Sequence, residues 1–301
     1  ALPVLTLLAA SERADRQRGR RHKLLTDWAR QGILQLCRWL PGREIIFVGD
    51  SSFAVHDLAH AVDGRATLIS RLRLDANLFA PPPPGHPHTI GRSALKRKAR
   101  PEPRTLPKNP SVQWRRITLS ARYGHKVPKV LDVASDTALW QRRGTPPPPV
   151  RWVPVRDPDG RRDPRAFFST NTQLDPADII ALCVRRWRIE VILAETRAHL
   201  GVETRRQWSD GAIARPPPAL LGLHSLIALW ACDLLDPAST PCGAAGCRKQ
   251  SPTFTDAIGA VRLARRAGDI SLHSPTNRES PRSPRTASNE WPKRSASPHN
   301  A

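Results

Sequence analysis

Hydrophobic residues in the first part of the chain follow two different spacings. Between residues 11 and 40 they recur at helical intervals behind Ser11, a residue type that caps helices, and Pro41-Gly42 ends the pattern. Residues 44–48 then form the continuous apolar run EIIFV. Such a run is typical of a strand that is buried on both faces. The pattern therefore predicts one long helix followed by a buried strand.

The segment after this strand predicts a β-α-β unit. Residues 54–62 have the spacing of a helix, and residues 66–72 have that of a second strand. Asp50 lies directly after the first strand, in the stretch Gly49-Asp50-Ser51-Ser52. Because α/β sheets place reactive groups at the carboxyl ends of their strands, Asp50 is a candidate functional residue.

A Pro-rich and basic segment interrupts the pattern at residues 81–110, where we expect a loop. Three short β-like runs follow, separated by turn residues, at 114–119, 129–133 and 150–155. These runs predict a small antiparallel sheet, with residues 81–160 inserted into an α/β domain. Residues 1–80 and 161–235 would form the two parts of that domain.

A last strand is predicted at residues 166–170, and Asp175-Pro176 begins the helix that follows. At about 100° per residue, Arg186, Glu190 and Arg197 fall within roughly 40° of one another on this helix. A separate apolar stripe lies about a quarter-turn away and contains Trp187, Val191, Ala194 and Ala198. The spacing predicts that the apolar stripe packs and that the neighbouring side presents charge. An amphipathic surface helix with an Arg–Glu pair would give the same pattern.

The rest of the chain adds an apolar segment and a polar tail. Residues 219–235 are the most apolar stretch, but His224 and Asp233 interrupt it, so it predicts a buried helix instead of a membrane span. We expect a helical extension over residues 236–268. The Ser-, Pro- and Arg-rich tail at 269–301 is expected to be disordered.

Charge points to a polyanionic partner. The 301 residues carry 48 Lys and Arg against 26 Asp and Glu, a formal net charge of +22, and the basic residues recur along the whole length. Nucleic acid is the natural partner for such a chain. A chain rich in Arg, Pro and Ala can also arise from a GC-biased genome without selection for binding.

Cysteine usage and the start of the chain bear on the compartment. Five cysteines without a regular framework argue against a secreted disulfide scaffold, and Cys242 and Cys247 lack a second Cys/His pair nearby for a zinc site. The first ten residues lack the basic region of a signal peptide. We expect a cytoplasmic, nucleoid-associated protein. Because the chain contains no Met, we expect it to be part of a longer reading frame.

Asp50 and Glu190 together predict a metal site. A carboxylate at a strand tip and one on a following helix can converge to hold Mg²⁺, which takes oxygen ligands and also binds phosphate. Two-metal phosphoryl transfer uses such ligands and usually needs a third carboxylate. Each residue also has a plain structural interpretation, Asp50 as a helix cap or turn former and Glu190 as a partner of Arg186.

Several motifs resemble bacterial insertion-sequence transposases of the DDE class, in the branch marked by a Tyr-x2-Arg-x3-Glu-x6-Lys/Arg signature. The run RRWRIEVILAETRAHLG, followed by VETRRQWSDGAIARPPPALLGLHSL, keeps the spacing of Arg186, Glu190 and Arg197, with Cys183 where the family has Tyr. FVGDSSFA resembles the family's strand that carries the second catalytic Asp, and RQRGRRHK and TDWARQ match further segments. The resemblance covers roughly residues 1–265, and the tail departs from the family's usual ending.

The resemblance implies a mixed α/β, ribonuclease H-like fold interrupted by a β insertion. Asp50 and Glu190 would be metal ligands for Mg²⁺, in a two-metal site where Mn²⁺ can substitute. Arg186 and Arg197 would steady Glu190 and contact phosphates of double-stranded DNA at transposon ends and targets. A further part of the DNA-facing surface would contain Arg20, Arg21 and Lys23, unless these form a solvated helix face. Synapsis by a homodimer is implied as well.

The resemblance also places the family's first catalytic Asp on a strand that precedes Ala1. The chain is therefore expected to be an N-terminally truncated transposase, incomplete at its first strands, with little or no strand transfer. Other carboxylates follow Asp50 in the wrong topological order to replace the missing one, namely Asp57, Asp75, Asp132 and Asp136. Asn171 stands where the family commonly has Asp, and we expect it to affect a local hydrogen bond or turn instead of catalysis.

Two other functions compete with a transposase. A non-catalytic DNA-binding remnant would occupy element ends or pair with an intact transposase. An RNA-binding protein is poorly supported, because aromatic residues make up only 5% of the chain and the sequence shows no evident stacking platform.

Overall fold

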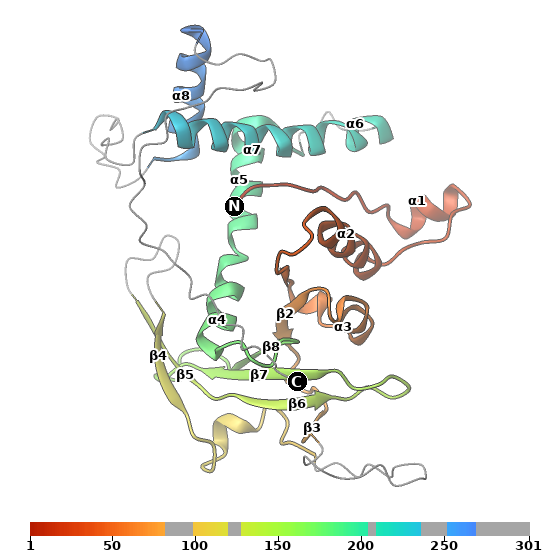
Figure 1. The fold of residues 1–301 in the computed structure, drawn as a ribbon, viewed down its shortest axis with the longest axis vertical. Coiled ribbons are helices and arrows are strands. Elements are labelled where there is room, and N and C mark those ends of the chain that lie inside the picture. Colours follow the sequence, from red (N-terminus) through yellow and green to blue (C-terminus); the bar gives the residue numbers. More distant parts are fainter. Residues whose placement is uncertain (82–98, 120–127, 204–208, 236–251, 269–301) are drawn as a thin grey trace, which may run out of the picture. The chain divides into compact units, whose positions relative to one another are not determined.

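The computed structural model describes residues 1–81, 99–119, 128–203, 209–235 and 252–268 (Figure 1). The chain divides into two compact units, Ala1–Leu229 and Trp230–Ala301. Most of the Pro-rich loop, Cys242 and Cys247, and the tail predicted to be disordered lie outside the described residues.

The first unit is built around one mixed sheet. Its path runs in the order β1-β2-β8-β7-β5-β4, while β6 pairs with β7 and with β3. Strands β1 and β2 are parallel, and the other pairs are antiparallel. The strands are β1 (Ile46–Val48), β2 (Thr67–Leu72), β3 (Leu78–Phe79), β4 (Arg115–Leu119), β5 (Lys129–Val133), β6 (Asp136–Trp140), β7 (Pro149–Arg156) and β8 (Arg165–Ser169).

Helices flank this sheet, which confirms the predicted mixed α/β fold and is consistent with a ribonuclease H-like arrangement. The helices of the first unit are α1 (Glu12–Gln17), α2 (Leu25–Trp39), α3 (His56–Val62), α4 (Pro176–Arg185), α5 (Arg188–Leu200) and α6 (Asp210–Ala214). Helix α7 (Pro216–Leu234) spans the boundary between the units, and α8 (Phe254–Arg266) belongs to the second. Two short 3₁₀ turns occur at Ser51–Phe53 and Leu106–Lys108.

The two faces of the sheet pack against different helices, because successive strand residues point to opposite sides. Leu68, Leu72 and Phe168 are buried in a cluster with residues of α2 and α3. On the other face, alternate positions such as Ile69 and Val153 form a second cluster with residues of α4. Figure 1 shows α3 and α4 on opposite sides of β2 and β8. The strands predicted as an insertion are hydrogen-bonded into this same sheet.

The predicted β-α-β unit is confirmed by the parallel pairing of β1 with β2 around α3. The expectation that its first strand is buried on both faces is wrong. All three residues of β1 are half-buried, since this strand ends the sheet among the described residues and pairs only with β2. Residues 44–48 therefore owe their apolar character to partial burial at an edge.

The single helix predicted over residues 11–40 is instead two helices. Ser11 caps α1 as expected, because its Oγ accepts a hydrogen bond from the Ala14 amide at 3.3 Å. Gly19 then takes a left-handed backbone conformation, with φ of 62°, which ends the helix before α2 begins. Residues 15–23 contain no apolar residue, so the apolar spacing that begins at Leu24 does not report on this segment.

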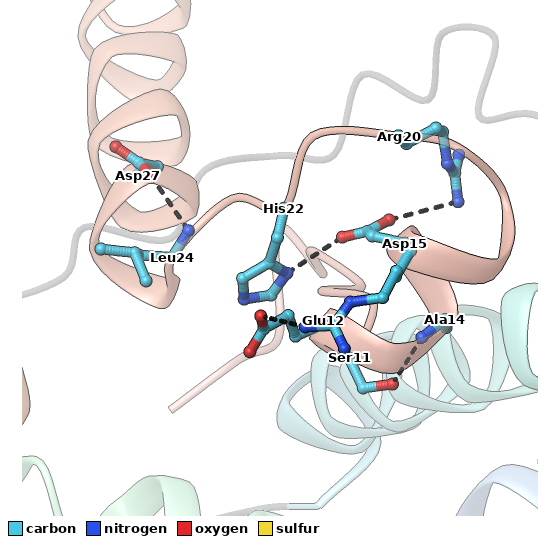
Figure 2. A network of polar contacts seen from close by, with 9 residues as sticks. Ser11, Glu12, Ala14, Asp15, Arg20, His22, Leu24 and Asp27 are labelled. Atoms are coloured by element: carbon cyan, nitrogen blue, oxygen red, sulfur yellow. Dashed lines mark hydrogen bonds and ion pairs between the residues drawn. The ribbon is translucent and has the colours of Figure 1, made fainter.

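The turn between α1 and α2 is held by Asp15, which is only 8% exposed (Figure 2). Its carboxylate lies 3.0 Å from His22 Nδ1 and pairs with Arg20 at 3.5 Å. The start of α2 is fixed separately, because the Leu24 amide donates to Asp27 at 3.0 Å. The basic segment at residues 16–23 is therefore an ordered turn built on one buried carboxylate.

Helix α7 is also less buried than its composition predicts. Leu223, Leu226 and Leu229 are 38, 47 and 49% exposed, whereas Ile227 is buried. The helix forms as predicted, but the prediction that it is buried is wrong. By length and composition, the helical stretch Gly211–Leu234 would suffice to cross a membrane, and 17% of its most apolar window is buried.

Gly49→Ala tests the packing that positions the end of β1. A Cβ at this position would lie 2.7 Å from Phe53 Cβ and 3.1 Å from the Phe47 ring. We expect Gly49→Ala to lower the free energy of unfolding by about 1–3 kcal/mol, the usual cost of overpacking. Urea unfolding followed by circular dichroism measures it. Gly222→Ala, which meets nothing within 4 Å, is the matched control and is expected to be neutral or stabilising.

Candidate active site

Asp50 lies where the sequence places it, at the carboxyl end of β1. The Gly49 amide still donates to Ile69 O at 2.9 Å, so the parallel pairing extends to the residue before Asp50. The Ser70 hydroxyl donates to the Asp50 carbonyl at 2.5 Å. Two contacts with β2 thus fix the backbone that carries this carboxylate.

The Asp50 side chain caps the short turn at Ser51–Phe53. Its Oδ1 accepts hydrogen bonds from the Ser52 amide at 2.8 Å and from the Ser52 hydroxyl at 2.5 Å. The Ser52 hydroxyl holds the pKa of Asp50 below its usual value of 3.8; partial burial opposes this effect, and the Ser52 amide and the charge of Arg186 add to it. Asp50 is therefore ionised at neutral pH. The capping interpretation is confirmed, and Oδ2 has no hydrogen-bond partner among the described residues.

A cavity of about 210 Å³ lies beside Asp50, on the face of the sheet that packs against α4. Its walls contain the ends of several strands and the junction of α4 with α5. Six basic residues line it, against three carboxylates, so the walls carry a formal charge of +3. The basic residues are Arg71, Lys129, Arg156, Arg162, Arg165 and Arg186, and the acidic ones are Asp50, Asp157 and Asp163.

Arg186 connects this cavity to Glu190. The predicted helix is divided here: α4 ends at Arg185, and the amides of Trp187, Ile189 and Glu190 bond to carbonyls three residues back. This tightening is the 3₁₀ pattern. Arg186 lines the cavity with Asp50 and pairs with Glu190 at 3.2 Å. Glu190 does not line the cavity, so the two predicted carboxylates are related through the Arg186 guanidinium.

The Arg186–Glu190 pair contributes little to the stability of the fold. Exposed i,i+4 pairs contribute about 0.3–0.5 kcal/mol, and placing the Arg before the Glu is the less favourable order. The Glu190 side chain is 43% exposed, in the first turn of α5, where the helix dipole favours a negative charge. Stability alone therefore explains Glu190 only weakly.

The apolar stripe predicted for this helix does not pack. Trp187 is 56% exposed, Val191 is 36% exposed, and Ala194 and Ala198 are exposed as well. Ile192 and Thr196 are the buried residues of α5 instead. The 3₁₀ tightening at Arg186 and Trp187 departs from the uniform 100° spacing on which the prediction rested. Trp187 consequently stands at the wall of the cavity.

The other predicted basic residues lie away from the cavity. Arg197 pairs with Glu203 instead of Glu190, because Glu203 takes a φ of 59° just after the helix. Arg20 pairs with Asp15, and Lys23 Nζ lies 4.8 Å from the centre of the Trp28 ring. Arg21 is exposed in the same turn. None of these four residues lines the cavity beside Asp50.

Sequence reasoning missed most of the residues that line the cavity. Arg71 and Arg165 are on adjacent strands and point to the same face as Ile69 and Phe167. Asp157, Arg162 and Asp163 belong to the turn DPDGRRDP, which the sequence marks only as a connection. The available signal was the excess of charge within this turn, directly before a strand.

The carboxylates considered as substitutes for a missing Asp are each paired with arginine. Asp132 contacts Arg116 at 2.9 Å and Arg156 at 3.5 Å. The other pairs are Asp57 with Arg142, Asp75 with Arg73 and Asp136 with Arg100. Asn171 keeps a local turn, since its Oδ1 accepts from the Gln173 amide at 2.9 Å. None of these carboxylates, nor Asn171, lines the cavity.

The residues fit a divalent metal in part. Asp50 and Glu190 each keep one carboxylate oxygen without a hydrogen bond among the described residues, and carboxylate oxygens are preferred Mg²⁺ ligands. Within the same residues, no group of three or more His, Cys, Asp or Glu is placed to hold a metal. The described residues therefore supply two carboxylates, each with one available oxygen, that are related through the Arg186 guanidinium.

Cys183, which stands at the Tyr position of the resembled signature, also lines the cavity. Burial raises the pKa of its thiol to about 12, and the charge of Arg186 opposes this only partly. The thiol is thus protonated at neutral pH and is a poor nucleophile and a poor metal ligand.

Comparison with known proteins gives a match over the first part of the chain. A family model described as DDE superfamily endonuclease matches residues 2–128, a segment that includes Asp50 and ends before Glu190. A search of curated proteins found no match. The family match supports the resemblance at the level of the DDE superfamily. It also supports a nuclease- or transposase-like function.

Alkylation of the cysteines tests the environment of Cys183. At pH 8, we expect Cys183 to resist iodoacetamide in the native protein, because its pKa of about 12 leaves almost no thiolate. Peptide mass spectrometry quantifies the modification. Exposed Cys232 is the internal control and should react, and Cys183 should react once the protein is unfolded. Equal labelling of Cys183 and Cys232 in the native state would contradict this picture.

Asp15→Asn tests whether the basic turn depends on its carboxylate. Removing this nearly buried charge takes the ionic partner from Arg20, and we expect a decrease of about 1–3 kcal/mol in the free energy of unfolding. Thermal unfolding measures it. Glu12→Gln, which breaks only the exposed pair with Arg16, is the control and should change stability by less than about 0.5 kcal/mol.

Proposed function

We propose that this chain is part of a metal-dependent DNA transposase of the DDE class that cuts DNA at the ends of an insertion sequence. The observation that carries the proposal is the placement of Asp50 and Arg186 in one cationic cavity, with Glu190 paired to Arg186. The family match over residues 2–128 supports it independently.

Asp50 and Glu190 are the proposed metal ligands in this function. A bound Mg²⁺, or Mn²⁺ in its place, would supply an activated water and neutralise charge on the scissile phosphate. Asp50 is ionised at neutral pH and keeps Oδ2 available, which suits that role. Arg186 contacts Glu190 and, in this proposal, contacts a DNA phosphate as well, since a guanidinium binds phosphate in a bidentate manner.

A complete two-metal reaction needs more than these two carboxylates. The described residues offer no third ligand in a cluster with them, so we propose that this chain alone performs little or no strand transfer. Arg197, Arg20, Arg21 and Lys23 are proposed to contact DNA outside the cavity, on a nucleoid-associated protein. Dimerisation in a synaptic complex is proposed from the family resemblance.

A second candidate is a non-catalytic DNA-binding remnant of such a transposase. This candidate is favoured by the position of Arg186, which pairs with Glu190 and adds to the lowering of the pKa of Asp50. Its positive charge can therefore neutralise the two carboxylates in place of a metal ion. In that case the cationic cavity would bind DNA without cutting it. Glu190→Ala distinguishes the two functions. A protein that only binds DNA should keep its affinity for DNA in this variant, whereas a transposase should lose cleavage.

Nicking of supercoiled plasmid in Mn²⁺ tests the proposed function. We expect weak nicking by the full chain that EDTA abolishes, and Asp50→Asn and Glu190→Gln should each reduce it by at least about tenfold, because each removes a metal ligand. Gel electrophoresis measures the rate. The control is Glu44→Gln, an exposed carboxylate outside the cavity, which should nick as the wild type does.

The outcome separates the two candidates. Nicking that persists in both Asp50→Asn and Glu190→Gln would contradict the assigned ligands. If the wild type shows no metal-dependent nicking but binds DNA, and Glu190→Ala binds equally well, the non-catalytic remnant is the correct function.

A further inference from the structure

Ser70 is a polar residue at a core position of β2. Its neighbours on the same face, Leu68 and Leu72, are buried in the cluster that packs against α2 and α3, and its direct partner on β8 is Phe168 of the same cluster. Ser70 itself is 0% exposed. A buried hydroxyl lowers stability unless it is hydrogen-bonded, and an apolar residue here would bury more hydrophobic surface. Packing alone therefore does not explain a serine at this position.

The hydroxyl of Ser70 contacts the main chain of Asp50. It donates to the Asp50 carbonyl oxygen at 2.5 Å, from β2 to the residue that follows Gly49 at the end of β1. The backbone pairing stops one residue earlier, where the Gly49 amide donates to Ile69 O at 2.9 Å. Among the described residues, the Ser70 hydroxyl is thus the group of β2 that is hydrogen-bonded to Asp50. A side chain extends the contact between the two strands by one residue.

The same carbonyl begins the turn that orients the Asp50 carboxylate. It also accepts a hydrogen bond from the Phe53 amide at 3.1 Å, which closes the 3₁₀ turn at Ser51–Phe53. Within that turn, the amide and hydroxyl of Ser52 both donate to Oδ1 of Asp50. Ser70 therefore holds the oxygen at which the turn begins, and the turn sets the direction in which Oδ2 points.

Ser70 acts from the opposite side of the sheet. Successive residues of a strand point to opposite faces, so Ile69 and Arg71 lie on the face of α4 and the cavity, whereas Ser70 lies on the face of α2 and α3. The Ser70 side chain does not line the cavity beside Asp50. It can therefore affect a ligand of Asp50 only through the Asp50 main chain.

We infer that Ser70 is a positioning residue, which holds the main chain of Asp50 so that the carboxylate presents Oδ2 to a divalent metal. This inference rests on the proposed function for the role of Asp50 as a metal ligand. It adds to that site a residue on the far face of the sheet. Removing a group that orients a metal ligand typically costs roughly 10- to 100-fold in metal affinity.

Ser70→Ala tests the inference, because it removes the hydroxyl and leaves a small side chain in the core. We expect it to weaken Mn²⁺ binding to the full chain by about tenfold, the low end of that range, since Ser70 acts through the backbone. Isothermal titration calorimetry measures the affinity. Ser70→Thr keeps a hydroxyl and should retain most of the affinity.

Ser169→Ala is the matched control. Ser169 is also 0% exposed and lies on the adjacent strand β8, but its Oγ accepts from the Asn171 amide at 3.1 Å and it does not line the cavity. Each alanine variant loses a buried hydrogen bond, so we expect similar decreases in the melting temperature. A purely structural role of Ser70 would give both variants the same Mn²⁺ affinity, whereas we expect a loss in Ser70→Ala alone.

Amide hydrogen exchange gives a second measurement that needs no metal. The Phe53 amide donates to the carbonyl that Ser70 holds. In EDTA, we expect this amide to exchange roughly fivefold faster in Ser70→Ala than in the wild type, as the loss of one hydrogen bond predicts. Ser169→Ala should leave its exchange rate unchanged. Nuclear magnetic resonance spectroscopy follows the exchange at this single amide.

The inference is overturned if Ser70→Ala binds Mn²⁺ like the wild type, if Ser169→Ala weakens binding equally, or if exchange of the Phe53 amide is unchanged in Ser70→Ala. Weak binding by Ser70→Thr at an unchanged melting temperature would also contradict it. A wild type that binds no Mn²⁺ would end the assigned metal ligands of the proposed function and the metal part of this inference, while faster exchange in Ser70→Ala would still establish that Ser70 holds the turn. Tight Mn²⁺ binding by both the wild type and Ser70→Ala would retain the ligands and remove the role of Ser70.

Discussion

The guanidinium of Arg186 joins the sheet to the helix that carries Glu190. It pairs with Glu190 at 3.2 Å. The pKa of Asp50, at the end of β1, is lowered mainly by the Ser52 hydroxyl, and the charge of Arg186 adds to this effect. Two carboxylates from distant parts of the chain are thereby related through one cation. The position of Arg186 depends on the 3₁₀ tightening between α4 and α5, which also brings Trp187 to the cavity wall.

The arginines of the sheet differ in whether they meet carboxylates. Arg116 and Arg156 both meet Asp132, although Arg156 also lines the cavity. At the cavity, Arg71, Arg162 and Arg165 have no such partners among the described residues. Such unneutralised charge reduces stability, and proteins commonly retain it where it binds a ligand. The net charge of +22 alone therefore says less about function than the positions at which basic residues have no acidic partner.

Local pattern was enough to predict the sheet and the position of Asp50. The β-α-β unit, β4, β5, β7 and β8 all follow from runs of apolar residues bounded by turn residues. The two-residue strand β3 was not predicted, because so short a segment gives no periodic signal. Strand β6 was missed because its first two residues, Asp136 and Thr137, are polar and leave only three consecutive apolar residues. The break at Gly19 was missed because the polar residues 15–23 carry no apolar spacing, and the helical pattern from Leu24 onward was extended back to Ser11.

The site was predictable only where its residues lie close together in sequence. Arg186 and Glu190 are four residues apart on one helix, and their contact was predicted and is present. Arg71 and Arg165 come together through strand pairing, which no local spacing reveals. The pairing of Arg197 with Glu203 depends on a left-handed residue after the helix, so a helical projection could not show it.

Binding of Mn²⁺ measured by electron paramagnetic resonance tests the central claim most directly, because it requires neither DNA nor cleavage. The account predicts that the wild-type chain binds Mn²⁺ and that Asp50→Asn and Glu190→Gln each weaken the binding at least about tenfold, as removal of a ligand from a carboxylate site requires. Mn²⁺ binding that is absent in the wild type, or unchanged in both variants, would contradict it.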